Sequence, residues 1–329
     1  MFAFTAGQYI NVRAQVGDRD VRRSYSLCST PHSGEWRIAI KRVDGGQFSQ
    51  WANMLLRVGD SIEIMPPDGR FLFLPDARKK RHMLLLAAGS GITPILAILK
   101  TILECEPLSQ VTLVYGNRRV RDIIFKEAIE DLRDRYLTRF QLIHCLSREP
   151  QEAPMSSGRL DAAKVKLLLN TLLKPDALDA VYICGPNEMI QECAAAAREA
   201  GVPEAKIHKE LFGTSSQKIV SNLSNVSEMQ DALAADSARI TVIADGIERV
   251  LHVPYRGESI LEVALAAGID APYACKAGVC CTCRARVLAG EVKMDANFTL
   301  EQHEIDRGFV LTCQSHPITD DVRITFDER

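Results

Sequence analysis

The chain has 329 residues, of which 47% are hydrophobic and 25% are charged, as in ordinary globular proteins. This length predicts two or three domains, each able to bury its own core. The net charge of -2 favours neither a nucleic acid nor an anionic membrane as a partner. The longest apolar run, Met83 to Ala88, is too short to cross a bilayer.

Short β-strands are predicted for residues 1–76, at 9–13, 24–28, 36–42 and 61–65. Glycine, proline and aspartate separate them, which is typical of a small antiparallel β-barrel. Two motifs fall in this region, Arg23-Ser24-Tyr25-Ser26 and Gly45-Gly46-Gln47-Phe48-Ser49. By themselves they indicate an amphipathic edge strand and a turn before a helix, although such a turn can also bind phosphate through its backbone amides.

Apolar strands alternating with helices are predicted for residues 77–212. The strands are expected at 83–88, 111–115, 140–146, 181–184 and 207–211, and helices at 123–135 and 188–200. This alternation is typical of a doubly wound α/β nucleotide-binding domain with a parallel sheet.

A nucleotide site is indicated by Gly89-Ser90-Gly91-Ile92-Thr93-Pro94, which follows a predicted strand and opens a helix. Glycines let the backbone approach a pyrophosphate, and the helix N-terminus offers free N–H groups. Alone, the motif is equally typical of a tight turn without a ligand. Its place at the carboxyl end of a parallel strand favours the site, as does Cys184-Gly185-Pro186 at the end of another.

Residues 213–236 are polar and rich in serine and asparagine, so we interpret them as a linker. Residues 237–329 are predicted to form a third domain. It opens with a hairpin (240–244 and 249–253) and a helix at 259–267, before a cysteine-rich loop.

The cysteine spacing is the most specific signal in the chain. Cys275, Cys280 and Cys283 form C-x4-C-x2-C, and Cys313 follows after 29 residues. This is the plant-type ferredoxin spacing for a [2Fe–2S] cluster, whereas zinc sites favour two separate C-x2-C pairs. Cys281 is expected to be a bystander. The remaining cysteines lack disulfide spacing, which, with no signal peptide at Met1, predicts a cytoplasmic protein.

In their order along the chain, these motifs resemble the ferredoxin–NADP reductase superfamily. The C-terminal plant-type ferredoxin domain (a β-grasp fold) narrows the resemblance to three-domain reductases of multicomponent oxygenases. Residues 22–29, 40–43, 146–149, 158–161 and 309–314 are most similar to the reductase subunits of bacterial phenylacetyl-CoA ring-epoxidases.

The resemblance implies a role for each matching residue. Tyr25 stacks on the flavin, Ser26 lies near its redox-active edge, and Arg23 binds the FAD pyrophosphate. The phosphate cradle is completed by Lys41, Gly46, Gln47 and Ser49. Thr93 lies where the nicotinamide meets the flavin and Cys184 lies beside the nicotinamide, and Glu210 and Phe212 close the far face of the flavin. The other residues expected to bind the nucleotide are Gly89, Gly91, Pro94, Gly185 and Pro186.

Two further expectations come from the same resemblance. Ser147 and Arg148 match the place where NADPH-selective members bind the 2'-phosphate, and a hydroxyl with a guanidinium suits a dianion. Relatives also carry one or two barrel strands ahead of the segment that here begins at Phe4, so we expect an N-terminally truncated barrel that holds FAD weakly.

The expected function follows from electron counts. A nicotinamide delivers two electrons as hydride, a [2Fe–2S] cluster accepts one, and flavin can do both. We therefore expect NADPH to reduce FAD, then the cluster, then an oxygenase, with phenylacetyl-CoA epoxidase as the first candidate. An NADH-dependent reductase of a Rieske or steroid hydroxylase, and a flavin-free electron carrier, remain as alternatives.

Overall fold

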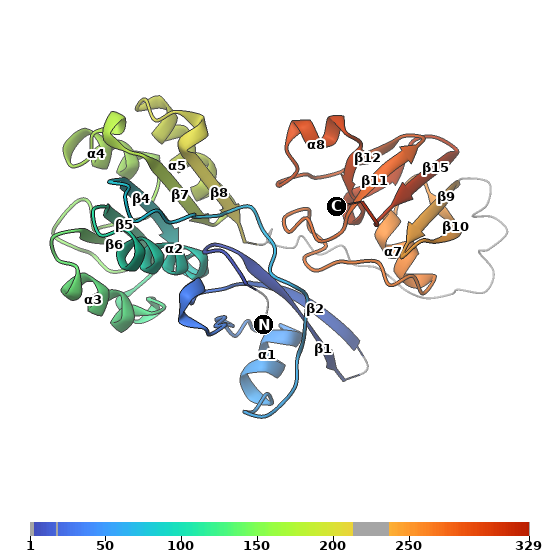
Figure 1. Ribbon diagram of the computed structural model, residues 1–329, viewed down its shortest axis with the longest axis horizontal. Helices are drawn as coiled ribbons and strands as arrows, with labels where there is room; N and C mark the ends of the chain where they lie inside the picture. Colours follow the sequence, from blue (N-terminus) through green and yellow to red (C-terminus); the bar gives the residue numbers. More distant parts are fainter. Residues whose placement is uncertain (1–2, 18, 213–236, 329) are drawn as a thin grey trace. The chain divides into compact units, whose positions relative to one another are not determined.

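The computed structural model describes residues 3–17, 19–212 and 237–328, so the predicted linker lies outside the described residues. The chain divides into two compact units, Met1–Phe212 and Gly213–Arg329 (Figure 1). The first unit contains two sheets, and the second unit contains the cysteine loop.

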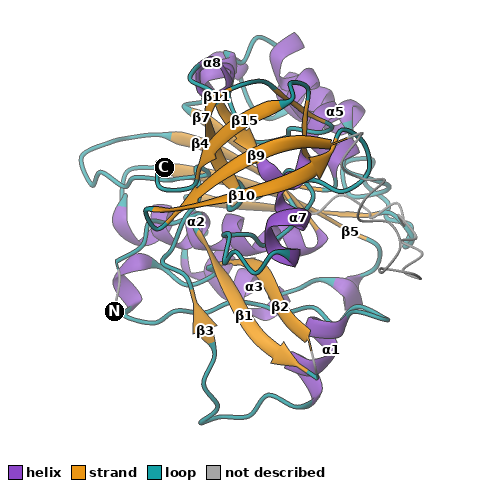
Figure 2. Cartoon of the chain, turned by 90° about the vertical axis from the view of Figure 1, so that its right-hand side faces the viewer, coloured by secondary structure: helices purple, strands orange, loops and turns teal. Residues whose placement is uncertain are grey.

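The N-terminal sheet is antiparallel, in the order β2-β1-β3. Its strands are β1 (Tyr9–Val16), β2 (Arg19–Ser26) and β3 (Glu63–Ile64). Single bridges Ala6↔Phe73, Tyr9↔Asp68 and Leu27↔Ile38 extend the pairing beyond the strands. Helix α1 (Gln47–Met54) lies beside the β1–β2 hairpin (Figures 1 and 2) and buries Phe48 in the small core of this sheet.

The predicted strand at 36–42 is wrong, because the segment contributes only the bridge at Ile38. Its alternating Trp36, Ile38 and Ile40 are half-buried against the same core, so the alternation reflects packing of one side of an irregular segment. The strand predicted at 61–65 shrinks to the two residues of β3, and the one at 24–28 is the end of β2.

The second sheet is parallel, in the order β6-β5-β4-β7-β8. It comprises β4 (His82–Ala88), β5 (Gln110–Asn117), β6 (Phe140–Leu146), β7 (Ala180–Gly185) and β8 (Ile207–Leu211). Helices α2 (Ile92–Cys105) and α3 (Lys126–Arg135) cover one face. Helices α4 (Ala162–Thr171) and α5 (Asn187–Glu199) cover the other.

Helix α3 begins three residues later than predicted. Phe125 has a φ of 59°, in the left-handed region, and Val120–Asp122 forms a separate 3-10 turn. The apolar pattern starts at Ile123 because Ile123 and Ile124 pack against the core as part of the loop.

The second unit is built on a mixed sheet in the order β10-β9-β15-β11-β13, with β12 and β14 paired separately. Its strands are β9 (Ser237–Ala244), β10 (Ile247–Pro254), β11 (Arg284–Ala289), β12 (Val292–Met294), β13 (Phe309–Leu311), β14 (Ser315–Pro317) and β15 (Asp321–Thr325). Helix α7 (Ile260–Ala266) starts with a capping box between Ser259 and Glu262, and α8 (Gln302–Asp306) precedes β13. The hairpin β9–β10 runs further than predicted at both ends.

No helix within residues 3–17, 19–212 and 237–328 has the length and apolarity needed to cross a bilayer.

Candidate functional site

The cysteine loop between α7 and β11 turns repeatedly through left-handed backbone. Lys276 and Cys281 have φ values of 52° and 53°, and Gly278 has 73°. A Cβ atom on Gly278 would lie 3.0 Å from the Ala296 carbonyl oxygen, so the close approach of these segments requires glycine. The turns aim amide groups at sulfur: Ala277 N donates to Cys275 Sγ at 3.3 Å, and Cys275 N to Cys280 Sγ at 3.4 Å.

The four spaced cysteines meet as two pairs. The Cys275 thiol donates to Cys280, which lowers the pKa of Cys280 and raises that of Cys275, and the Cys283 thiol is related to Cys313 in the same way. Among the described residues, no three histidine, cysteine or acidic side chains surround a single metal-ion position. Each iron of a [2Fe–2S] cluster takes two thiolates, so two pairs with amides directed at sulfur fit this group.

Cys281 lies between two of these cysteines but points its thiol elsewhere. Its Sγ donates to the Thr299 hydroxyl at 2.9 Å. All ten cysteines of the chain are free thiols. The geometry thus separates Cys281 from the two thiol pairs.

On the first sheet, Tyr25 and Ser26 lie at the end of β2. The Tyr25 ring centroid is 5.6 Å from that of Phe48, and burial raises the pKa of Tyr25 to about 12. Ser26 is buried and its Oγ has no hydrogen-bond partner among the described residues. A buried hydroxyl without a partner is destabilising, so a polar atom of a bound flavin fits here.

Of the residues expected at the FAD phosphates, the structure brings only Gly46 and Ser49 together. Ser49 Oγ accepts from Val43 N at 3.1 Å and contacts Gly46 O at 3.3 Å, so it braces the loop. No side chain caps α1 at Gly46, which leaves its first amides available to an anion. The side chains of the other three expected residues, Arg23, Lys41 and Gln47, are exposed.

In the parallel sheet, the two predicted nucleotide loops touch. A Cβ atom on Gly91 would lie 2.2 Å from the Cys184 carbonyl oxygen, so only glycine lets the start of α2 pack on the end of β7. Thr93 Oγ1 donates to Ser90 O at 3.1 Å, and Pro94 is buried in the first turn of α2. Gly185 and Pro186 continue from Cys184 into α5. This is the place where the strand order reverses, the usual ligand crevice of such sheets.

Glu210 lies beside Cys184, as its register partner on β8. Burial raises the pKa of Glu210 to about 8, and its Oε2 has no hydrogen-bond partner among the described residues. Burial, and then the nearby Glu210, raise the pKa of the Cys184 thiol well above its ordinary value. Phe212, expected with Glu210, packs against the core between the parallel sheet and α2.

The pairing of β5 and β6 continues past the ends of both strands. Ser147 N donates to Asn117 O at 3.0 Å, and Arg148 N to Arg118 O at 2.8 Å. Two exposed guanidinium groups, those of Arg118 and Arg148, therefore start from neighbouring backbone positions. Arg118 was missed, although it follows a predicted parallel strand, as Arg148 does, and carboxyl ends of parallel strands share one edge.

Three family models match the chain. Residues 1–73 match an oxidoreductase FAD-binding domain, residues 85–195 an oxidoreductase NAD-binding domain, and residues 242–317 a 2Fe-2S iron-sulfur cluster binding domain. They appear in the order that the resemblance implies. FAD, a pyridine nucleotide and a [2Fe–2S] cluster are thus the cofactors of this chain.

Two relatives match this chain over nearly its whole length. The chain is 38% identical to one of the subunits of 1,2-phenylacetyl-CoA epoxidase from Escherichia coli K12, over 100% of this chain and 90% of that protein. It is 35% identical to the ferredoxin reductase component of 3-ketosteroid-9-alpha-monooxygenase from Mycobacterium tuberculosis H37Rv, over 99% and 86%. These relatives confirm the predicted family.

Among solved structures, phthalate dioxygenase reductase has the same fold. The TM-score is 0.58 at 22% identity, covering 98% of this chain and 88% of that one. This confirms the predicted fold class, a flavin-binding barrel followed by a nucleotide-binding α/β domain and a ferredoxin-type domain. The chain belongs to the three-domain oxygenase reductases of the ferredoxin–NADP reductase superfamily, and it is an oxidoreductase that takes electrons from a pyridine nucleotide.

Proposed function

We propose that this reductase passes electrons from NADPH through FAD and its [2Fe–2S] cluster to an oxygenase that epoxidises phenylacetyl-CoA. The observation that carries the proposal is the presence of all three cofactor domains in one chain whose whole length matches a component of such an epoxidase. Bound flavin accepts hydride and releases electrons singly, which reconciles a two-electron donor with a one-electron cluster.

The protein's own part in this scheme is to bind and orient. We assign the flavin ring to Tyr25 and Ser26, and the FAD phosphates to the uncapped start of α1 at Gly46. The two loops that are in contact at Gly91 and Cys184 would hold the nicotinamide against the flavin ring. The four paired cysteines, Cys275, Cys280, Cys283 and Cys313, would ligate the cluster.

Glu210, a half-buried residue whose Oε2 is buried, keeps its proton below about pH 8. A neutral carboxyl adds no negative charge beside an incoming electron-rich nicotinamide, and no protein acid or base is required for hydride transfer itself. Its Oε2, which has no hydrogen-bond partner among the described residues, is then available to a polar group of the bound cofactor.

NADPH is the proposed nucleotide because two exposed arginines, Arg118 and Arg148, flank Ser147 at one sheet edge. Glu149, the residue after Arg148, accepts from Val120 N at 2.7 Å. A pair of guanidinium groups suits a 2'-phosphate better than a ribose diol.

The nucleotide assignment is tested with Arg148→Ala. Losing one charge-assisted hydrogen bond costs about 1.5–3 kcal/mol, so kcat/KM for NADPH should fall about tenfold or more while that for NADH stays near its original value. Arg133→Ala, which removes an exposed arginine paired with Asp134 on α3, is the matched control. Equal losses with both nucleotides would contradict the assignment.

The partner is tested by coupled turnover. The purified reductase should support NADPH-dependent epoxidation of phenylacetyl-CoA by a purified epoxidase. The similarity to the steroid monooxygenase reductase favours a second candidate, in which a steroid hydroxylase is served instead. Support of the steroid enzyme but not of the epoxidase would replace the proposed partner. We further propose a cytoplasmic location, supported by the six cysteines outside the proposed cluster ligands, none of which forms a disulfide.

A further inference from the structure

The segment that leaves the flavin-binding sheet is fastened to the parallel sheet by side chains that the cofactor sites do not include. Phe73 N donates to Ala6 O at 3.0 Å, just before β1, so residues around 72 belong to the first sheet. β1 in turn pairs with the end of β2, where Tyr25 and Ser26 lie. Any shift of this segment therefore moves the proposed flavin contacts.

Tyr182, in the middle of β7, makes the first attachment. Its hydroxyl donates to Leu72 O at 2.9 Å, and its ring stacks on His208 at 4.6 Å between centroids. Phe71 contacts the same ring edge-on at 5.2 Å. Burial raises the pKa of Tyr182 to about 12, so the hydroxyl remains a donor at physiological pH.

Tyr182 and Cys184 point to the same face of β7, because side chains alternate along a strand, and both belong to the core on that face. Two residues of strand span about 7 Å. The strand residue that makes the attachment is thus only two positions from Cys184, at the proposed nicotinamide position.

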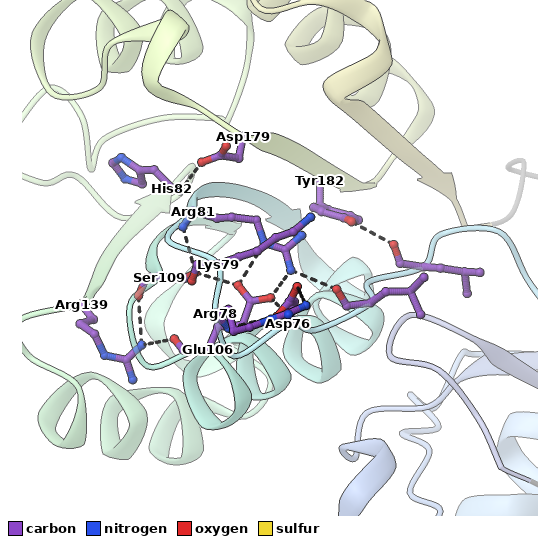
Figure 3. Close-up of polar contacts among 12 residues, drawn as sticks. Asp76, Arg78, Lys79, Arg81, His82, Glu106, Ser109, Arg139, Asp179 and Tyr182 are labelled. Atoms are coloured by element: carbon purple, nitrogen blue, oxygen red, sulfur yellow. Dashed lines mark hydrogen bonds and ion pairs between the residues drawn. The ribbon is translucent and has the colours of Figure 1, made fainter.

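Arg81, just before β4, makes the second attachment. Its Nη2 donates to Leu74 O at 3.0 Å, and its guanidinium lies 4.7 Å from the Phe73 ring centroid. The same guanidinium forms a bidentate pair with Glu106 (Figure 3). Glu106 is completely buried at the end of α2.

The ion pair between Arg81 and Glu106 is fixed in place, because Glu106 accepts further hydrogen bonds. Glu106 also accepts from Asp76 N at 2.9 Å and from Ser109 Oγ at 2.7 Å. Burial alone would raise the pKa of Glu106, but these hydrogen bonds and that from Arg81 lower it below its ordinary value. An ionised, fully bonded carboxylate fixes the guanidinium, and so fixes Leu74.

We propose that Tyr182 and Arg81 are positioning residues for hydride transfer: their hydrogen bonds to Leu72 O and Leu74 O set the distance between flavin and nicotinamide. The inference rests on the proposed placement of the two rings at β2 and β7. Neither residue touches a reacting atom. Small errors in such a distance are costly, because hydride transfer requires the reacting atoms to be nearly in contact.

The test is Tyr182→Phe, which keeps the ring and removes one hydrogen bond. Anaerobic reduction of bound FAD by NADPH should slow about fivefold, the factor that corresponds to one net hydrogen bond. The primary isotope effect with NADPH deuterated at the transferred position should rise, and the charge-transfer absorbance between the two rings should weaken. Flavin content and the Kd of NADPH should not change.

Arg81→Lys provides a second, independent variant. Lysine keeps the charge beside Glu106 but lacks the fork that reaches Glu106 and Leu74 O together, so it should slow hydride transfer in the same way. Tyr255→Phe is the matched control, since it loses a hydroxyl contact to Asp320 within the second unit. It should leave the reduction rate unchanged.

Unchanged reduction rates and isotope effects in both variants would overturn the inference. So would slowing that is accompanied by loss of flavin at an unchanged isotope effect, because that pattern shows a merely structural role. Failure of the proposed function gives a different result: the unmodified protein would not reduce its flavin with NADPH at all.

Discussion

Two buried oxygen atoms, Ser26 Oγ and Glu210 Oε2, have no hydrogen-bond partner among the described residues. A buried oxygen without a hydrogen-bond partner is destabilising unless a ligand supplies that partner. A polar group left unsatisfied in a fold commonly marks a functional site. Both atoms lie where the flavin and nicotinamide are proposed to meet. Ser237 Oγ and both ring nitrogens of His144 are likewise without a partner among the described residues, so the two oxygens support the proposed site through their position at the ends of β2 and β8.

The Glu210 carboxyl should make stability depend on pH. Its folded pKa of about 8 exceeds the unfolded value, so the folded state binds more protons than the unfolded state between these values. The contribution is fully present below the unfolded pKa and is lost as pH rises towards 8, by at most about 1.4 kcal/mol per pH unit.

Glu210→Gln should remove this dependence. We expect Tm of the first unit to fall more between pH 6 and pH 8 in the original protein than in the variant, by scanning calorimetry without added nucleotide. Identical slopes in the two proteins would show that Glu210 does not titrate in this range.

Cys281→Ser should leave the cluster intact. The Cys281 thiol donates to Thr299, and a serine hydroxyl can make the same contact. Iron content and the visible iron–sulfur spectrum should match those of the original protein, whereas Cys280→Ser should lose both. Loss of iron from the Cys281 variant would mean that the ligand assignment is wrong.

Helix α2 is the element that joins the cofactor crevice to the positioning network. Its first turn packs on the end of β7 through Gly91, and its last turn leads to Glu106. Arg139 secures this last turn, donating to Leu103 O at 2.8 Å and to Glu106 O at 2.9 Å. Both ends of this buried helix are therefore held, one at the cofactor crevice and one at the network around Glu106.

Gly91→Ala should separate α2 from β7. The added methyl would meet backbone atoms of Cys184, which cannot move aside as a flexible side chain can, and such overpacking typically costs about 1–3 kcal/mol. Tm and NADPH affinity should both fall. Gly116→Ala, at the matching end of β5, is the control: its nearest neighbour would be Leu160 Cβ at 3.2 Å, so a smaller loss is expected. Equal losses of Tm and of NADPH affinity in the two variants would show that the contact of Gly91 with Cys184 has no special importance.

The whole molecule combines two units with different charge. The second unit, residues 213–329, holds 11 Lys and Arg against 17 Asp and Glu, net -6, and the first unit, residues 1–212, holds 29 against 25, net +4, in a chain whose total is -2. Flavin and nucleotide sites lie in the first unit and the cluster cysteines in the second. The first unit thus holds the sites for hydride transfer and the second unit holds the one-electron cluster.

Cys313→Ser should separate these activities. Without its fourth thiolate the cluster should not assemble, while the first unit remains unchanged. NADPH-dependent reduction of ferricyanide, which can accept electrons from flavin directly, should persist, and reduction of cytochrome c or of an oxygenase should be lost. Persistent oxygenase reduction in an iron-free variant would contradict the proposed electron path.

The sequence by itself determined the cofactors and the order of the domains. Ligand spacing on one loop and glycines at strand ends are local features, since they depend on neighbours in the chain. Buried parallel strands were also predictable, because both faces are covered and the apolar run is continuous. The strand at 36–42 was not, because a half-buried loop also shows alternating apolar residues.

Only the tertiary structure decided which distant groups meet. The pairing of β5 and β6 places Arg118 beside Arg148, 30 positions apart, and packing of the segment before β4 against β7 lets the Tyr182 side chain reach Leu72, 110 positions away. The same holds for Glu210, whose raised pKa arises from burial beside β7 and not from its sequence neighbours. Local patterns specify elements, whereas the pairing of those elements creates the environments that position and tune the side chains.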